Sequence, residues 1–162
     1  MDFTVLHPPQ IDLKAPKGSW KIRRMGANNM SLALVMEYKK RKILFTGDIE
    51  KESEHEILSH WKTKGEGLDV DILKVGHHGS KTSSSMSFIK AVQPEYAIIQ
   101  VGRNNFGHPA PTTLNTLERS GGIKDKSSIY RNDKQGCIRV FLGDEIHIIP
   151  WLTYHRQTWY NR

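Results

Sequence analysis

The sequence contains a single cysteine, Cys137, among 162 residues, and it has no long apolar run. One cysteine excludes an intramolecular disulfide framework and a zinc cluster built from several thiolates of this chain. Apolar runs such as Ile43–Phe45 and Tyr96–Ile99 are far below the ~18 residues that span a bilayer, and Met1–Pro9 lacks the features of a secretion signal. The sequence therefore predicts no membrane segment, and any metal site would use histidine and carboxylate ligands.

Acidic residues are in the minority, with 17 Asp and Glu against 24 Lys and Arg, for a formal net charge of +7. The basic excess lies in residues 1–42 and 123–162, whereas residues 43–122 are slightly acidic. Basic flanks attract anions such as phosphates, and central carboxylates can hold a cation. The same balance is typical of an ordinary soluble surface, so charge alone does not assign a function.

The order of predicted elements indicates one layered α/β or α+β domain, without internal repeats or low-complexity tracts. Strands and helices alternate in the middle of the chain, and paired strands flank them. We expect strands at 32–38, 42–46, 71–75, 96–101, 128–131, 137–142 and 145–149, and helices at 50–62, at 86–92 and from 111 to before 121. The first two strands predict a hairpin with a charged turn at 39–41.

Two strand ends carry residues with chemical potential. Asp48 follows one strand through Gly47, and it could equally begin the following helix. His77 and His78 follow another strand and stand between glycines. Paired histidines without apolar periodicity rarely serve packing, and neutral imidazole binds zinc or manganese or carries protons near neutral pH. We expect one histidine to be a metal ligand and the other to face substrate or a carboxylate, but the residues alone do not assign which.

A third loop, Gly102–Pro109, also follows a strand. It combines a guanidinium, two amides and an imidazole, which can hold phosphate oxygens and protonate a leaving group. These groups belong to Arg103, Asn104, Asn105 and His108. An alternative is a turn stabilised by bonds from Asn side chains to the backbone.

The Ser80–Ser85 segment directly follows the histidine pair and contains Lys81. It is expected to contact phosphate, with a polar linker as the alternative. The remaining histidines lack such surroundings, so we expect surface or structural roles for His7, His55, His60, His147 and His155.

An ordered set of segments resembles the ComEC family of competence DNA-internalisation proteins, in their C-terminal metallo-β-lactamase-like domain. The resembling segments are Asn28–Leu32, Thr46–Asp48, Leu73–Ser84, Val101–Pro109, Tyr130–Asp133 and Gly136. The resemblance implies a four-layer αββα sandwich with two divalent metals, zinc or manganese, and a nuclease role in DNA uptake.

The resemblance also implies roles for individual residues. Asp48 would bridge the two metals, and His77 or His78 would be the final histidine ligand, with His77 slightly favoured by the single G-H of related members. The other histidine, with Arg103 and His108, would contact phosphate or shuttle a proton. Contacts to DNA would come from Ser80, Lys81, Asn104 and Asn105.

One departure from the family pattern is clear: neither H-x-D-x-D-H nor H-x-H-x-D-H occurs in the sequence. We therefore expect residues 1–162 to form one partial domain, the second half of the αββα sandwich, with its core at 28–149 and a C-terminal tail at 150–162. Its partners would be DNA and the missing first half, and its metal site would be incomplete and inactive alone. The family's parent proteins lie in the bacterial inner membrane, whereas this chain by itself would stay in the cytoplasm.

Two other functions are compatible with the sequence. The chain could be a non-catalytic nucleic-acid-binding module that uses its basic flanks, with stacking or strand-packing roles for Trp151, Trp159 and Tyr160. It could also be another metallo-β-lactamase-fold hydrolase that acts on a small phosphoester.

Overall fold

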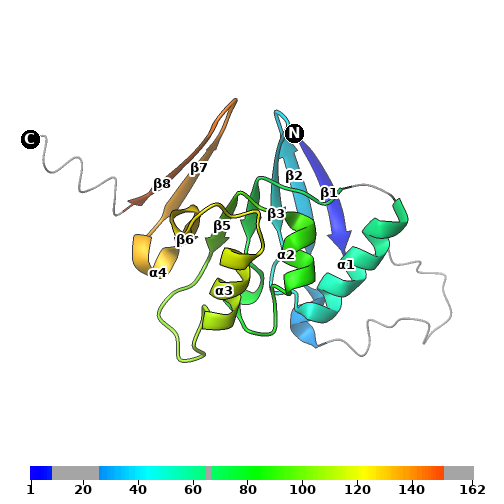
Figure 1. The fold of residues 1–162 in the computed structure, drawn as a ribbon, viewed down its shortest axis with the longest axis horizontal. Coiled ribbons are helices and arrows are strands. Elements are labelled where there is room, and N and C mark those ends of the chain that lie inside the picture. Colours follow the sequence, from blue (N-terminus) through cyan, green and yellow to red (C-terminus); the bar gives the residue numbers. More distant parts are fainter. Residues whose placement is uncertain (9–25, 65–66, 152–162) are drawn as a thin grey trace, which may run out of the picture.

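A six-stranded mixed sheet forms the centre of the computed structural model, which describes residues 1–8, 26–64 and 67–151 (Figure 1). The spatial order of the strands follows the chain from β1 to β6. The first three strands pair antiparallel, and β3 to β6 pair parallel. The strands are β1 (Asp2–His7), β2 (Ala33–Tyr38), β3 (Arg41–Phe45), β4 (Ile72–Lys74), β5 (Tyr96–Ile99) and β6 (Ile129–Arg131).

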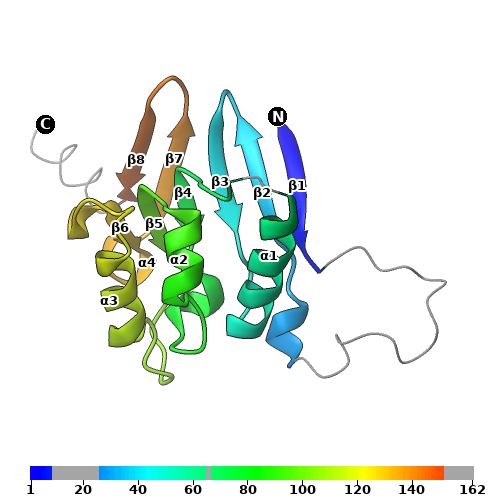
Figure 2. The ribbon, with the colours of Figure 1, turned by 45° about the vertical axis from the view of Figure 1, so that its right-hand side comes forward.

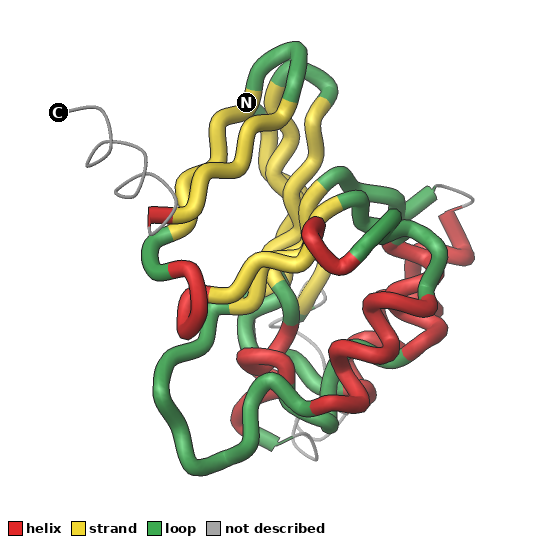
Figure 3. Tube along the Cα trace, turned by 60° about the vertical axis from the view of Figure 1, so that its left-hand side comes forward, coloured by secondary structure: helices red, strands yellow, loops and turns green. Residues whose placement is uncertain are grey.

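Three helices cover one face of this sheet: α1 (Lys51–Lys64), α2 (Met86–Val92) and α3 (Pro111–Arg119) (Figure 2). A separate hairpin of β7 (Ile138–Leu142) and β8 (Ile146–Pro150) lies on the side away from the helices (Figure 3). Short helical turns connect these elements at Ala27–Met30, Gly76–Gly79, Lys126–Ser128 and, as α4, Asn132–Gln135. The predicted mixed α/β class is therefore confirmed.

The main core lies between the sheet and the helices. Leu44, Leu73 and Ala97, in neighbouring strands, are fully buried against the apolar faces of the helices. The helix predicted at 50–62 is found as α1; Ile57 is buried, Leu58 and Trp61 pack against the core, and Ile49 just before the helix is buried too. Each large apolar side chain buried here contributes roughly 1.5–3 kcal/mol, so this layer supplies most of the hydrophobic stabilisation.

Strand β1 was missed by the sequence analysis. It pairs antiparallel with β2, with a register shift between Val5 and His7, and its outer residues Phe3 and Val5 remain exposed. Residues Asp2–Val5 alternate polar and apolar side chains, but the stretch is short and its apolar residues are exposed, so pairing with β2 rather than burial of one face holds this edge strand. The other predicted strands are found, with ends that differ by one or two residues.

The predicted hairpin between β2 and β3 is confirmed, with a two-residue turn. Lys39 and Lys40 have φ values of 49° and 66°, and Tyr38 pairs directly with Arg41. Two consecutive positive φ angles are typical of the turn that best fits the twist of a hairpin.

The face of the sheet opposite the helices keeps apolar side chains exposed. Val5, Leu34 and Phe45 are direct cross-strand neighbours, so they form a row on this face. Val5 is 58% exposed and Phe45 is 39% exposed. The described residues therefore leave part of this face uncovered.

The described helices include none with both the length and the apolar character needed to cross a membrane.

Candidate functional site

The candidate residues meet at the carboxyl ends of the parallel strands β3, β4 and β5. Ligand sites form at this edge in open α/β sheets, because the loops that leave neighbouring parallel strands converge there. Asp48 Oδ1 lies 3.6 Å from His78 Nε2, and the rings of His77 and His108 lie 5.5 Å apart. Three segments separated in the sequence therefore form one cluster.

Asp48 is positioned by the backbone turn at Gly47. Gly47 has a φ of 54°, and a Cβ atom there would lie 2.7 Å from the Ser31 Cβ. The Asp48 amide donates to Ser31 Oγ at 3.0 Å. The Gly47 carbonyl accepts from the His77 amide at 3.2 Å and from Lys74 Nζ at 2.6 Å. This turn therefore links the Asp48 strand end to the histidine strand end.

We expect Gly47→Ala to lower the free energy of unfolding by about 2–3 kcal/mol. The left-handed backbone costs roughly 1–2 kcal/mol for a residue with a Cβ, and the close approach of Ser31 adds overpacking strain. Urea titration of the purified protein measures this change. Gly102→Ala is the matched control, because nothing lies within 4 Å of a Cβ at Gly102. Equal unfolding free energies for the two variants would contradict the tight approach.

Lys74 is a site residue that the sequence analysis did not single out, although it belongs to the segment quoted for the resemblance. Its side chain is largely buried, and its Nζ lies 3.7 Å from Asp48 Oδ1. Burial lowers the pKa of Lys74, and the Asp48 carboxylate opposes that effect. The buried ammonium therefore stabilises the ionised carboxylate. In the sequence, the signal for this role is a lysine that interrupts the apolar residues of a short strand, between Leu73 and Val75.

His78 is held in one orientation by the backbone. Its Nδ1 lies 2.6 Å from the Gln100 carbonyl oxygen, which can only accept, so Nδ1 carries the proton. In the neutral ring, Nε2 then presents a lone pair on the side of Asp48. A carbonyl that fixes the ring in this way is typical of histidines that bind metals. His78 is 47% exposed and Asp48 is 37% exposed, so a ligand can reach both.

His77 faces a different carboxylate. Its Nδ1 lies 3.2 Å from Glu50 Oε1, to which Thr82 Oγ1 donates at 2.7 Å. Asn28 Nδ2 lies 3.5 Å from both His77 Nε2 and Glu50 Oε1. Glu50 was not predicted as a site residue, and Asn28 and Thr82 were predicted only as parts of longer segments, because their convergence depends on the packing of three separate segments.

The backbone of the histidine pair is strained. His77 and His78 have φ values of 45° and 54°, in the left-handed region that side chains with a Cβ rarely adopt. Each such residue costs roughly 1–2 kcal/mol. Strain of this kind persists where the surrounding structure holds it, and it is concentrated at functional sites.

His108 completes the histidine cluster. Its Nδ1 is buried and has no hydrogen-bond partner within the described part of the chain. Burial lowers its pKa, and the neighbouring His77 and His78 lower it further. His108 is therefore a neutral imidazole at pH 7 and can accept a proton.

The other candidates have different surroundings. The side chain of Asn104 bonds within its own loop. Its Nδ2 donates to the carbonyls of Gly102 and His108, and its Oδ1 accepts from the amides of Phe106 and His108. The loop-stabilising alternative therefore holds for this residue. Ser80 is buried and bonds to Thr82, whereas Lys81 is exposed. Arg103 and Asn105 are also exposed.

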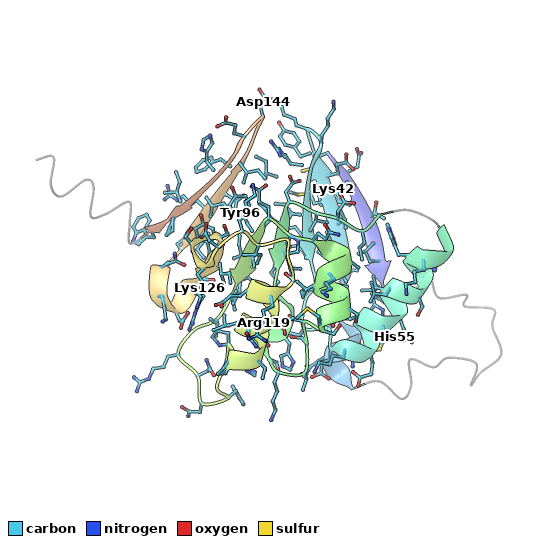
Figure 4. The ribbon with its side chains drawn as sticks, in the orientation of Figure 1. Lys42, His55, Tyr96, Arg119, Lys126 and Asp144 are labelled. Atoms are coloured by element: carbon cyan, nitrogen blue, oxygen red, sulfur yellow. The ribbon has the colours of Figure 1, made fainter. Side chains whose placement is uncertain are left out.

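The remaining histidines have the roles expected of them. His7 is buried and bonds through Nε2 to the Asn29 carbonyl at 2.7 Å, a structural contact. His55 on α1 and His147 on β8 are exposed, as is His60 (Figure 4 labels His55). Trp151 lies beneath the Arg139 guanidinium at 5.3 Å from the ring centre. His155, Trp159 and Tyr160 lie outside the described residues.

Comparison with known proteins agrees with this geometry. The family model of the metallo-beta-lactamase superfamily matches residues 25–103, which include Asp48 and both His77 and His78. Residues 25–103 are therefore similar to the metallo-β-lactamase superfamily. The predicted fold family is thereby confirmed, with the helix layer, one sheet and a two-stranded hairpin described here.

The chain is also similar to ComEC-type competence proteins, as the sequence predicted. It is 40% identical over 113 residues to ComE operon protein 3 of Bacillus subtilis (strain 168), covering 69% of the chain and 13% of that protein. It is 37% identical over 144 residues to Competence protein ComA of Neisseria gonorrhoeae, covering 88% of the chain and 18% of that protein. Recombination protein 2 of Haemophilus influenzae is 34% identical over 150 residues, covering 91% of the chain and 16% of that protein. The chain thus spans less than a fifth of each relative.

Members of the metallo-β-lactamase superfamily typically bind divalent metal ions, and the described residues offer part of a ligand set for such an ion. Asp48 and His78 provide a carboxylate oxygen and an imidazole nitrogen 3.6 Å apart. A catalytic zinc site usually has three protein ligands. Across residues 1–8, 26–64 and 67–151, no three or more His, Cys, Asp or Glu side chains are arranged to hold an ion. The described residues therefore fit part of a metal site and do not form a complete one.

Proposed function

We propose that this chain is part of the metal-dependent nuclease domain of a ComEC-type DNA-uptake protein. Its relatives include proteins named ComE operon protein 3, Competence protein ComA and Recombination protein 2. The longer parent protein would lie in the bacterial inner membrane, and its substrate would be DNA that enters the cell. The basic flanks of the sequence suit a polyanionic substrate.

The observation that carries this proposal is the pairing of Asp48 Oδ1 with His78 Nε2, whose ring is fixed by the Gln100 carbonyl. In the proposal these atoms are two ligands of a zinc or manganese centre, and residues outside the described cluster complete it. A segment of the H-x-D-x-D-H type would supply them. A divalent cation there provides Lewis-acid chemistry to a phosphodiester.

The protein's own groups prepare the site. Lys74 lies beside Asp48, with Nζ 3.7 Å from Oδ1, and the contacts of His77 with Glu50 and Thr82 hold its strained turn. His108, kept neutral by its surroundings, is suited to exchange a proton with the substrate or with water. His78 is thus assigned to ligand binding, in place of the slightly favoured His77, because His78 is the one that faces Asp48.

The open face of the sheet supports completion of the site by another segment. The exposed row of Val5, Leu34 and Phe45 ends at Phe45, three residues before Asp48. A layer that covers this row removes apolar surface from water, at roughly 25 cal/mol per Å2.

Calorimetric titration with Zn2+ and Mn2+ tests the proposal. The protein is titrated alone and then mixed with a first-half domain segment of a relative that carries H-x-D-x-D-H. We expect two metal ions per complex in the mixture and weaker, substoichiometric binding by the protein alone. Failure to bind either metal in the mixture would overturn the proposal, and tight binding of two ions by the protein alone would overturn the need for a second segment. His78→Gln should remove at least one of the two ions, whereas His147→Gln, at an exposed position on β8, should remove neither.

A further inference from the structure

A hollow lies beside the strand-end cluster, which consists of Asp48, His77, His78 and His108. The hollow has a volume of about 220 Å3 and is bordered by the start of α1, the loop before α2 and the first turns of α3. Since one water occupies about 30 Å3 of liquid, the hollow has room for a phosphate group and several waters. Its lining residues are Lys51, Lys81, Ser83, Ser84, Ser85, Met86, Thr112, Thr113 and Thr116.

The lining is cationic and rich in hydroxyl groups. Lys51 and Lys81 are exposed, and neither forms an ion pair with a carboxylate within 4 Å in the described ranges. None of the lining side chains is acidic. Lysine ammonium groups together with hydroxyl donors are the usual surroundings of a bound phosphate. This composition therefore favours an anion.

Ser84 is a buried hydroxyl that lacks a good partner. It is only 4% exposed, and its Oγ has a single contact, at 3.5 Å from Ser83 Oγ, beyond the usual range for two hydroxyls. Its φ of 57° is left-handed, and the Glu54 carboxylate accepts from the amides of both Ser84 and Ser85. The loop is therefore held in a strained shape that leaves the Ser84 hydroxyl available at the hollow.

The hollow adjoins the strand-end cluster through two peptide segments. Thr82 contacts Glu50 and His77, and its neighbours Lys81 and Ser83 line the hollow. Lys51 directly follows Glu50 in the chain. A strand that enters the cluster can thus place another of its phosphates in the hollow.

We propose that this hollow binds a backbone phosphate of the nucleic-acid strand, next to the phosphate that the strand-end cluster receives. The inference rests on the proposed function and deepens it, because a second phosphate site makes a polynucleotide the preferred ligand over a small phosphodiester. Lys51 and Lys81 neutralise the phosphate, and Ser84 and Thr112 lie where hydroxyl groups can donate to it.

Salt dependence of oligonucleotide binding tests this site without requiring hydrolysis. Fluorescence anisotropy of a labelled single-stranded 12-mer is measured from 50 to 300 mM salt for the full chain and for the double variant Lys51→Gln, Lys81→Gln. Each lost phosphate contact reduces the slope of log K against log salt by about 0.7, so loss of the one phosphate in the hollow should reduce the slope by about 0.7 and lower the affinity several-fold. The matched control is Lys62→Gln, Lys90→Gln, at exposed positions outside the hollow.

Inorganic phosphate serves as the second probe. In NMR spectra it should shift the amide signals of Ser84, Ser85 and Thr112 in the wild type and not in the Lys51→Gln, Lys81→Gln variant. Equal salt slopes for the hollow and control variants would overturn the inference, and phosphate shifts with an unchanged oligonucleotide slope would limit the hollow to free anions and overturn it as a nucleic-acid site. A changed slope in a protein that binds no metal with the added segment would preserve this inference while the proposed nuclease function fails.

Discussion

Replacement of Asp48 by alanine is expected to reduce DNA hydrolysis by about a thousandfold or more once the metal site is completed by a first-half segment. Asp48 contributes the carboxylate that faces His78, and its loss leaves the buried Lys74 ammonium without its counter-charge. A metal ion provides several kcal/mol of transition-state stabilisation, and each 1.36 kcal/mol corresponds to a factor of ten in rate. Cleavage of a labelled single-stranded oligonucleotide by the reconstituted domain measures the effect.

Binding of the oligonucleotide should remain nearly unchanged in this variant, because Asp48 carries no positive charge and the basic residues proposed to contact the backbone, Lys51 and Lys81, are still present. Asp48→Asn retains the shape of the side chain and separates loss of charge from loss of folding; it should be about as inactive as Asp48→Ala. Asp144→Ala is the control at an exposed aspartate, at the tip of the β7–β8 hairpin (Figure 4). Hydrolysis within tenfold of the wild type in both Asp48 variants would reject the ligand role.

Removal of the Glu54 carboxylate is expected to lower the free energy of unfolding by about 2–4 kcal/mol. Glu54 is 1% exposed and accepts hydrogen bonds from the amides of Ser84 and Ser85. Glu54→Ala leaves two buried donors without an acceptor, and each costs about 1–3 kcal/mol. Urea denaturation measures the loss. Glu118→Ala is the matched control on α3, where the ion pair with the exposed Lys126 contributes at most about 1 kcal/mol.

The pH dependence of this variant follows from the direction of the pKa shift. Burial raises the pKa of Glu54 above its usual value, against the opposing effects of its hydrogen bonds and of Lys51. A raised folded-state pKa contributes stability that is complete below the unfolded pKa and is lost as the pH rises through the folded pKa. The difference between wild type and Glu54→Ala should therefore be larger at pH 4.5 than at pH 8. A difference that grows with pH would show that the hydrogen bonds outweigh burial.

Glu54 also connects fold stability to the proposed phosphate hollow. It fixes Ser84 in a left-handed conformation, so its loss should weaken oligonucleotide binding as well as folding. The Gly47 turn likewise affects both stability and the site, because it positions Asp48. In both places, a left-handed backbone position is held by a neighbouring segment.

The sequence predicted those elements whose signal is local. The helix expected at 50–62, the helix expected from residue 111 and the charged turn expected at 39–41 were each found within one or two residues of their predicted place. Edge strand β1 was not predicted, because its stability depends on pairing with β2 and its outer face is not buried. Local patterns report burial on one face, whereas strand pairing joins residues far apart in the chain.

The sequence by itself determined that Asp48, the His77–His78 pair and His108 each follow a strand, and that their chemistry suits metal and phosphate. Only the tertiary structure decided that His78 rather than His77 faces Asp48, that Lys74 stabilises that carboxylate and that Asn104 holds its own loop. Parallel pairing of β3, β4 and β5 brings their ends together, and the φ angles of the two histidines turn the rings to different carboxylates. Side-chain direction at a turn depends on backbone angles that packing imposes, and these angles are not encoded in residue type alone.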